Sequence, residues 1–281
     1  MQPRSIARRR AVNAVISAIS GLAALFGIFM MGWILYEVIM RGARAINWAF
    51  FTQLPGPPVS SGGGLANAML GTLMMTALGA AIGIPIGLFA GVYLAEFGRN
   101  GRWATAIRFV GNLLMGTPSI ITGVFVYTVV VVTAGSFSGY AGAIALAIIM
   151  LPLMARTSED ILALVPNELR ESALALGAPR WRATLQVIFR AARNGLLTGA
   201  LLAIARVSGE TAPLLFTSLN SRLWSFTLAG PTPSLTVTTY TYAMSGYATL
   251  ENKAWAASLV IILAVLSLTV TARFVLQERK R

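Results

Sequence analysis

The sequence of 281 residues contains no cysteine and no histidine, and only two of its 22 basic residues are lysines. These absences exclude the usual zinc sites, thiol nucleophiles, disulfides and histidine-based acid–base catalysis, and we expect neither a bound metal nor a cofactor. Lys253 follows Asn252 and Lys280 follows Arg279, so no glycine–lysine pair is present to build a phosphate-binding P-loop. If ATP drives this protein, a separate polypeptide must bind the nucleotide.

Charged side chains are also scarce. They make up 11% of the chain, against 56% for hydrophobic residues, which is less than half the usual charged share of a soluble domain. This composition leaves too little polar surface to cover a globule in water, so the sequence predicts an all-α, polytopic membrane protein. The net charge of +13 would also suit a nucleic-acid-binding protein. Most of the basic residues, however, flank hydrophobic stretches on one side, and we expect lipid rather than nucleic acid around the chain.

Six hydrophobic stretches approach or exceed the roughly 20 residues that a helix needs to cross a bilayer. The first is too long for the apolar region of a cleaved signal peptide, so we expect a retained helix. Glycines spaced four residues apart in the second predict close helix packing, and the Gly116-Thr117-Pro118-Ser119 run predicts a break in the third. The six stretches cover residues 14–40, 67–94, 109–132, 140–154, 195–219 and 255–275.

Lysine and arginine are distributed unequally between the two sides of this six-helix arrangement. One side holds 17 of them and the other holds Arg41, Arg44, Arg222 and Lys253, with Arg206 left inside the fifth stretch. Because positive residues remain in the cytoplasm, both termini are predicted to lie inside. The predicted organisation is a cytoplasmic amino-terminal segment at 1–13, a first transmembrane helix with an external loop at 14–66, a five-helix core at 67–275 that contains an inner loop at 156–193, and a cytoplasmic carboxyl end at 276–281.

The inner loop at 156–193 has the pattern of two helices rather than of a disordered segment. Asn167 is a candidate amino-terminal cap for a short amphipathic helix, and Gly177 supplies its stop. A second helix is expected to begin at Pro179.

The first of these two helices carries a motif, in which Glu171-Ser172-Ala173 is followed by Gly177 and then by Val187, Phe189 and Arg190. The motif resembles the loop signature of the membrane subunits of bacterial ABC importers, which reads Glu-Ala-Ala, three residues, Gly, nine residues and Ile-x-Leu-Pro. The spacing matches throughout, and the departure of Arg190 from proline affects only the end of the signature. The resemblance implies the type I ABC importer permease fold. It also implies that a helix docks into a cleft of an ATPase subunit through Glu171, Ser172, Ala173 and Gly177.

A closer resemblance extends from Asn67 to Arg273, and its most specific part is the GETAPLLFT run at 209–217. Further matching segments are 107–109, 116–120, 205–208 and 242–245. Together these segments resemble the PstA-type permeases of bacterial high-affinity phosphate importers. The resemblance implies phosphate as the substrate and the inner membrane as the location. The implied partners are a second, related permease chain of the PstC type, two ATP-binding subunits of the PstB type and an extracytoplasmic phosphate-binding protein of the PstS type.

Independently of any family, the fifth hydrophobic stretch contains two charged residues, Arg206 and Glu210. A charge at the centre of a membrane helix costs roughly 2.5–3.5 kcal/mol on insertion scales, which favours a functional role over a structural one. Spaced i and i+4, the two side chains are expected to share one face of a helix loosened by Gly209 and Pro213. A guanidinium offers a planar fork of donors that matches an oxyanion. The sequence therefore predicts a substrate pathway that includes Arg206, Glu210, Thr211, Pro213, Pro118 and Ser119.

Three functions remain open at this point. The leading one is a phosphate-importer permease, and the second is the permease of another ABC importer for an oxyanion such as sulfate or molybdate. The third, an intramembrane enzyme, has the least support because no second carboxylate or histidine accompanies the charged pair. The choice of phosphate over the other oxyanions rests on the resemblance of the GETAPLLFT run alone.

Overall fold

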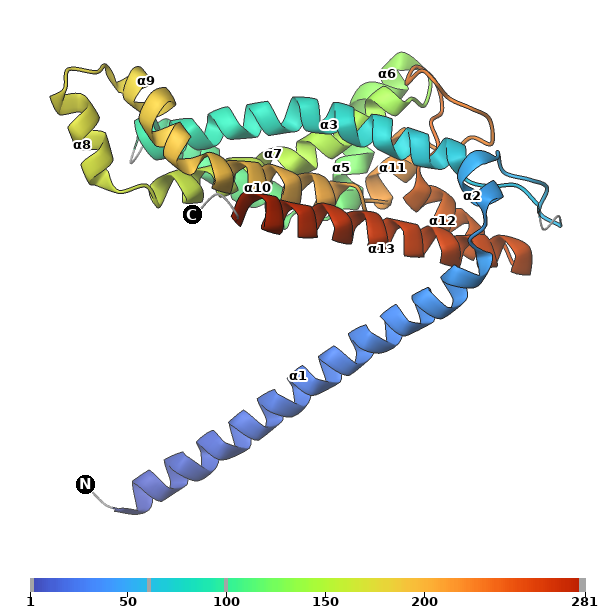
Figure 1. Cartoon of the computed structure of the whole chain (residues 1–281), viewed down its shortest axis with the longest axis horizontal. Coiled ribbons are helices and arrows are strands. Elements are labelled where there is room, and N and C mark those ends of the chain that lie inside the picture. Colours follow the sequence, from blue (N-terminus) through green and yellow to red (C-terminus); the bar gives the residue numbers. More distant parts are fainter. Residues whose placement is uncertain (1–2, 60–61, 99–100, 278–281) are drawn as a thin grey trace.

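The computed structural model describes residues 3–59, 62–98 and 101–277, and the regular secondary structure of these residues is helical (Figure 1). The predicted all-α class is confirmed. Residues 1–2 and 278–281 of the two predicted cytoplasmic ends, together with Arg99, lie outside the described residues. In chain order the elements are α1 (Pro3–Ala45), α2 (Trp48–Thr52), α3 (Ala66–Val92), the π-helix η1 (Tyr93–Gly98), α4 (Arg102–Gly116), α5 (Ser119–Val126), the π-helix η2 (Tyr127–Val131), α6 (Val132–Ala134), α7 (Gly139–Ala163), α8 (Asn167–Ala175), α9 (Arg180–Arg182), the π-helix η3 (Ala183–Ile188), α10 (Phe189–Val207), α11 (Ala212–Thr217), α12 (Leu235–Ala243) and α13 (Ala248–Gln277).

Five helical runs are long and apolar enough to cross a membrane, and a bent helix pair supplies a sixth span. The bent pair joins α4 to the run from α5 to α6 at an angle of 104°. The prediction of six transmembrane helices is confirmed when this pair counts as one span. The five unbroken runs are Arg8–Ala45, Ala66–Gly98, Gly139–Ala163, Arg180–Val207 and Ala248–Arg273.

The centre of the bundle is the packing of α3 against α7. A Cβ atom added at Gly87 would lie only 2.6 Å from the carbonyl oxygen of Leu151 in α7, so the two backbones touch at this point. Small residues allow such an approach, and the dispersion contacts of the closely packed backbones stabilise the helix pair in lipid. Pro85 lies inside α3 without ending it. The predicted packing stripe is confirmed at all four of its glycines, Gly79, Gly83, Gly87 and Gly91.

The fourth and fifth spans are among those that differ from their predicted limits. The fourth occupies Gly139–Ala163 rather than 140–154, because its carboxyl-terminal half continues into the polar region that sequence hydropathy assigned to the loop. The helix predicted to begin at Pro179 is continuous with the fifth span, so Arg180–Val207 forms one run of 28 residues. This run ends at Val207 instead of continuing to residue 219, since Gly209 and Pro213 both disfavour further helix.

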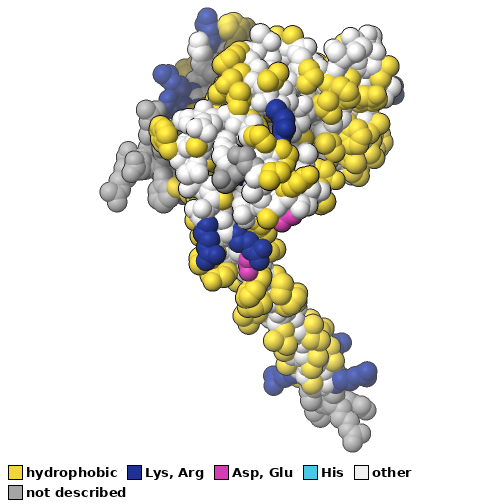
Figure 2. All heavy atoms as spheres, turned by 90° about the vertical axis from the view of Figure 1, so that its right-hand side faces the viewer, with side chains coloured by type: hydrophobic (Ala, Val, Ile, Leu, Met, Phe, Trp, Pro, Cys, Tyr) yellow, Lys and Arg dark blue, Asp and Glu magenta, His cyan; other side chains and the backbone are white. Residues whose placement is uncertain are grey.

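The first helix, α1, leaves the bundle (Figure 1). Only its carboxyl-terminal part packs closely on α13, where a Cβ atom at Gly42 would lie 2.7 Å from the carbonyl oxygen of Trp255. Apolar side chains cover the surface of the projecting part, as Figure 2 shows, and this chain leaves them exposed. A helix that is apolar all round requires lipid or another membrane chain as its surroundings. At the other end of the bundle from α2, the elements α8 and α9 form a compact projection (Figure 1).

Candidate functional site

The third span breaks where the sequence predicted. The helix α4 ends at Gly116, and α5 begins at Ser119, with Pro118 in the amino-terminal cap position. The hydroxyl of Thr117 donates a hydrogen bond to the carbonyl of Leu113 at 2.8 Å, so the broken segment satisfies part of its own backbone. Pro118 is exposed and Ser119 is half-buried.

The break in the fifth span changes the predicted geometry of the charged pair. Arg206 lies in the last turn of α10, whereas Glu210 lies in the connection between Val207 and Ala212. The expectation that both side chains share one helix face is therefore wrong, because the helix does not continue past Val207. No ion pair joins these two described side chains, and Arg206 is exposed while Glu210 is half-buried. The carbonyl of Glu210 accepts a hydrogen bond from the Thr236 hydroxyl of α12 at 2.8 Å, which stabilises the break.

The two breaks belong to elements that are in contact. A Cβ atom at Gly123 of α5 would lie 2.6 Å from the Cα atom of Pro213 in α11, so only glycine fits there. Thr211 is the half-buried cap residue of α11. The hydroxyl of Thr217 donates to the carbonyl of Pro213 at 2.7 Å and is not free for a substrate. The fold thus brings the broken segments of the third and fifth spans into one region of the bundle.

The predicted docking helix, α8, ends in a Schellman motif. Gly177 has a φ of +82°, a conformation that favours glycine. The amide of Gly177 donates to the carbonyl of Leu174 at 2.9 Å, and the amide of Ala178 donates to the carbonyl of Ala173 at 3.1 Å. The predicted stop at Gly177 is confirmed.

The beginning of α8 differs from the prediction. Pro166 occupies the cap position and Asn167 is the first helical residue, so the capping role expected of Asn167 is wrong. Its side-chain oxygen instead accepts a hydrogen bond from Nη1 of Arg170 at 3.2 Å. Glu171 and Ser172 are exposed, whereas Ala173 is buried.

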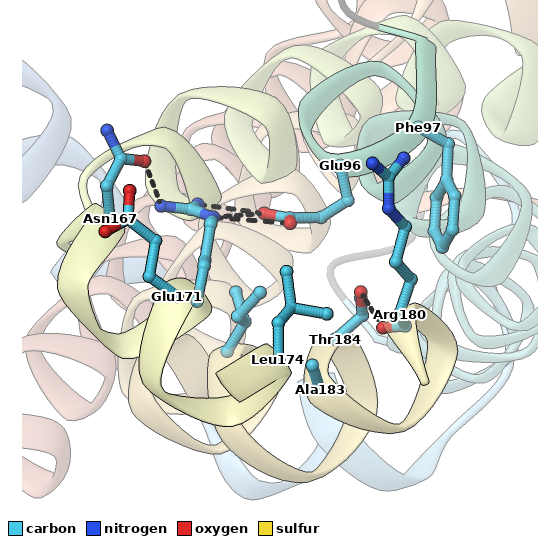
Figure 3. A pocket seen from close by; sticks show the side chains of 10 residues that line it. Glu96, Phe97, Asn167, Glu171, Leu174, Arg180, Ala183 and Thr184 are labelled. Atoms are coloured by element: carbon cyan, nitrogen blue, oxygen red, sulfur yellow. Dashed lines mark hydrogen bonds and ion pairs between the residues drawn. The ribbon is translucent and has the colours of Figure 1, made fainter. Parts of the chain in front are cut away.

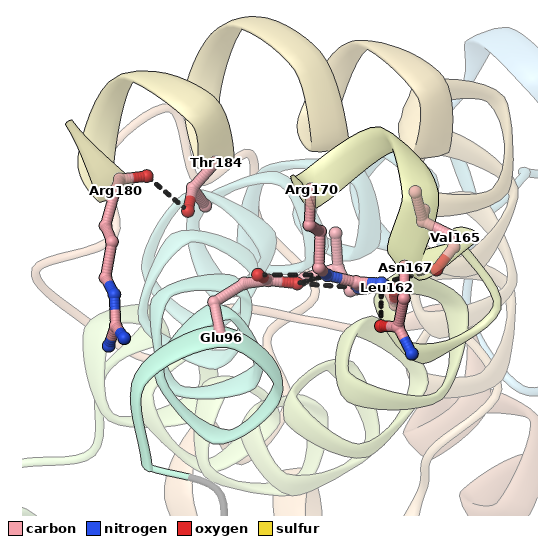
Figure 4. A network of polar contacts seen from close by, with 7 residues as sticks. All are labelled: Glu96, Leu162, Val165, Asn167, Arg170, Arg180 and Thr184. Carbon is pink, nitrogen blue, oxygen red and sulfur yellow. Dashed lines mark hydrogen bonds and ion pairs between the residues drawn. The ribbon is translucent and has the colours of Figure 1, made fainter. Parts of the chain in front are cut away.

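A cavity of about 300 Å³ lies between α8 and the end of the second span. Glu96 and Asn167 belong to one network of polar contacts beside this space, as the dashed lines in Figure 3 show. Arg170 connects them, because its guanidinium pairs with the Glu96 carboxylate at 2.8 Å (Figure 4). The sequence pattern did not reveal this pair, since its members are 74 residues apart and belong to separate elements. The cavity is lined by Glu96, Phe97, Asn167, Arg170, Glu171, Leu174, Arg180, Ala183, Thr184 and Ile188.

A second polar cluster joins α4 to α7. Nε of Arg108 lies 2.7 Å from Oε1 of Glu159, whose side chain is only 12% exposed. Arg156 lies 3.7 Å from the other oxygen of Glu159 and 3.2 Å from Asp160. The charge count of the sequence used Arg108 and Arg156 only to orient the helices in the membrane. Their contact with Glu159 became visible only in the folded structure.

The sequence and the fold of this chain are similar to those of known transport proteins. Residues 83–280 match the family of binding-protein-dependent transport system inner membrane components. The chain belongs to this family. The phosphate transport system permease protein PstA of Yersinia pestis is 46% identical over 272 residues, which are 97% of this chain and 92% of that protein. The PstA protein of Haemophilus influenzae is 43% identical, with 97% and 96% covered. A bacterial ABC transporter involved in the import of the acidic polysaccharide alginate has the same fold, with a TM-score of 0.67, 14% identity and 99% of each chain covered.

Membership in the inner membrane component family defines the general role of the chain. It is a multi-pass membrane subunit of an ABC importer and works with other ABC subunits. The relatives confirm the resemblance to PstA-type permeases that the GETAPLLFT run indicated. They are permeases rather than enzymes, which removes the intramembrane enzyme from the three functions.

Proposed function

We propose that this chain is the permease subunit of an ATP-driven importer that moves inorganic phosphate across the cell (inner) membrane. The observation that carries the proposal is the guanidinium of Arg206 at the broken end of α10. The names of relatives that are 46% and 43% identical support phosphate as the substrate.

The position of Arg206 suits a pathway. It lies 13 residues beyond Arg193, the last basic residue before the apolar part of α10, which corresponds to about 20 Å along a helix and reaches past the middle of a hydrocarbon core of about 30 Å. Its side chain is exposed within this chain. Because a charge facing lipid is costly, we infer that Arg206 faces a water-filled path or a second permease chain.

The chemistry of the two charged residues fits hydrogen phosphate. The guanidinium fork donates to phosphate oxygens, whereas the Glu210 carboxylate accepts a hydrogen bond from a protonated phosphate oxygen. Sulfate and molybdate are fully ionised at neutral pH and offer no such donor, so Glu210 repels them. We assign the adjoining broken backbone at Thr211, Pro213, Pro118 and Ser119 to the same pathway.

The partners follow from what the chain lacks and from its projecting helix. With no P-loop, the chain requires separate ATP-binding subunits of the PstB type. We propose that one of them receives α8 through the exposed Glu171 and Ser172, while the buried Ala173 and the stop at Gly177 fix the shape of the helix. A second permease chain of the PstC type completes the path, and an extracytoplasmic binding protein of the PstS type delivers phosphate.

Substrate choice can be tested in proteoliposomes that contain the complete transporter and its binding protein. We expect ATP-dependent uptake of radiolabelled phosphate that excess unlabelled phosphate suppresses and that excess sulfate or molybdate leaves unchanged. Transport of labelled sulfate or molybdate in place of phosphate would instead identify the second of the three functions.

We further propose that segments 1–13 and 276–281 and the loop 156–193 are cytoplasmic, around a core at 67–275. Leu223 and Leu164 are both well exposed in loops on opposite sides of this arrangement. In the natural cysteine-free background, Leu223→Cys is expected to react with an impermeant thiol reagent in intact cells. Leu164→Cys is expected to react only after the cells are permeabilised. Labelling of Leu164→Cys in intact cells would show that this loop lies outside and would contradict the proposed orientation.

A further inference from the structure

One guanidinium connects three elements at the end of the bundle that carries α8 (Figure 4). Nη2 of Arg170 donates to the Glu96 carboxylate of η1 at 2.8 Å, and Nε lies 3.2 and 3.3 Å from the same carboxylate oxygens. Nη2 also donates to the carbonyl of Leu162 at 2.7 Å. Nη1 donates to the carbonyl of Val165 and to the side chain of Asn167. Arg170 thus reaches from α8 both to η1 and to the end of α7.

The contacts of Arg170 are largely shielded from water, since the side chains of Arg170 and Glu96 are 13% and 8% exposed. An ion pair in such surroundings is retained only when its geometry is good and its remaining donors are satisfied. The planar fork of arginine meets both conditions here. Leu162 lies in the last turn of α7 and Val165 just beyond its end, a place where a cation is favourable.

The carboxylate partner belongs to an element that is rigidly held. η1 continues α3 without interruption, and α3 packs against α7 through its glycine stripe. At Gly91, the stripe glycine nearest to η1, an added Cβ atom would lie 2.4 Å from the Cβ atom of Ser158 in α7. An apolar cluster that includes Leu162, Ile188 and Val92 fills the space between these elements. A displacement of α8 that preserves the ion pair must therefore move the α3–α7 pair as well.

We propose that the ion pair between Arg170 and Glu96 is a latch that transmits the ATPase-driven displacement of α8 to the α3–α7 pair. The latch rests on the proposed function of this chain as the permease of an ATP-driven importer. Arg170 acts as a positioning residue, whereas its neighbour Glu171 is exposed on α8 for the partner. Consecutive residues of a helix point about 100° apart, so one short helix faces the ATPase and the latch at once.

The latch predicts a specific change in coupling. In proteoliposomes containing the complete transporter, Glu96→Gln and Arg170→Gln are each expected to lower the amount of labelled phosphate moved per ATP hydrolysed. Coupling free energies between sites are typically about 1–3 kcal/mol, so we expect this ratio of phosphate to ATP to fall by roughly 5- to 150-fold. The double variant is expected to be no worse than Arg170→Gln alone, because once Arg170 is lost the loss of Glu96 removes no further part of this contact. Arg180→Gln is the matched control. Arg180 lines the same cavity, but its guanidinium makes no ion pair with a described residue.

A covalent replacement separates a latch from a merely structural contact. The chain has no cysteine, so Glu96→Cys with Arg170→Cys introduces a unique pair. We expect this variant to be uncoupled when reduced and to regain phosphate transport per ATP when a short bifunctional maleimide joins the two thiols.

Three results would overturn the latch: wild-type coupling in both single variants at equal complex abundance, a parallel loss of ATP hydrolysis and transport with their ratio preserved, or no recovery after cross-linking. The proposed substrate fails independently, through the absence of phosphate uptake by the wild-type complex. In that case the same coupling ratio is measured with sulfate or molybdate, whichever is transported.

Discussion

Arg206→Gln is expected to abolish most phosphate uptake while the transporter assembles at normal abundance. The substitution keeps the approximate length and some hydrogen-bonding capacity of the side chain but removes its charge. Charge-assisted hydrogen bonds are worth about 1.5–3 kcal/mol each, which corresponds to a loss of roughly 10- to 150-fold in uptake. Arg206→Lys retains the charge without the planar fork, so we expect partial activity. The measurement is uptake of radiolabelled phosphate in a strain that lacks other phosphate transporters.

The matched control for this prediction is Arg44→Gln. Arg44 is an exposed cation near the end of α1, far along the chain from the two helix breaks. Its loss is expected to leave uptake at the wild-type level. Normal uptake by Arg206→Gln at equal abundance would show that the arginine is dispensable, and the pathway would then have to be sought first at the break around Pro118.

Gly177→Val is expected to eliminate ATP-driven uptake while the permease still inserts into the membrane. The φ of +82° at this position disfavours any side chain, and a β-branched residue most of all. No atom lies within 4 Å of a Cβ atom added here, so the effect arises from backbone strain rather than from a steric clash. Strain of this kind costs about 1–3 kcal/mol, which is as large as the net contribution of the two hydrogen bonds that close the exposed Schellman motif. The helix end that we assign to the ATPase contact is therefore expected to change shape, and co-purification of the ATPase subunit measures the loss.

Two further variants distinguish local strain from loss of docking. Gly177→Asn is expected to retain part of the uptake, because asparagine tolerates the left-handed conformation better than valine. Gly135→Val introduces the same kind of strain, at a φ of +70° and with open space around the Cβ position, but in the turn between α6 and α7. This variant is expected to keep the ATPase bound. Normal ATPase binding and uptake by Gly177→Val would contradict the assignment of α8 as the docking element.

The sequence predicted the number of spans well but their limits less accurately. Hydropathy identified six apolar stretches because lipid exposure requires them, whatever the tertiary structure. It placed the fifth stretch at 195–219, whereas the helix runs from Arg180 to Val207. Arg180, Arg182, Arg190 and Arg193 led to the prediction of a separate helix in the inner loop for the first half of this run, although one helix extending beyond the membrane accommodates them without difficulty.

For the candidate site, the helix breaks and stops were predicted correctly, the cap at Asn167 was not, and the long-range contacts were not predicted at all. The break at Pro118 and the stop at Gly177 follow from the backbone limits of proline and glycine, which act within a few residues. The pairing of Glu96 with Arg170, and of Arg108 with Glu159, depends on which elements become neighbours. The i, i+4 spacing of Arg206 and Glu210 predicted a shared helix face, but α10 ends at Val207, before Glu210.

By itself, the sequence determined that the chain is a helical membrane protein, that it has no P-loop with which to bind ATP, and that its inner loop carries a short helix that ends at Gly177. These properties depend on composition, on the length of apolar runs and on single residues with restricted backbones. Only the tertiary structure decided that the two broken spans touch at Gly123 and Pro213, and that Arg170 joins α8 to α3 and α7. Contacts between residues distant in sequence arise from the packing of helices, and the glycine stripe of α3 indicated that a close partner exists without specifying α7.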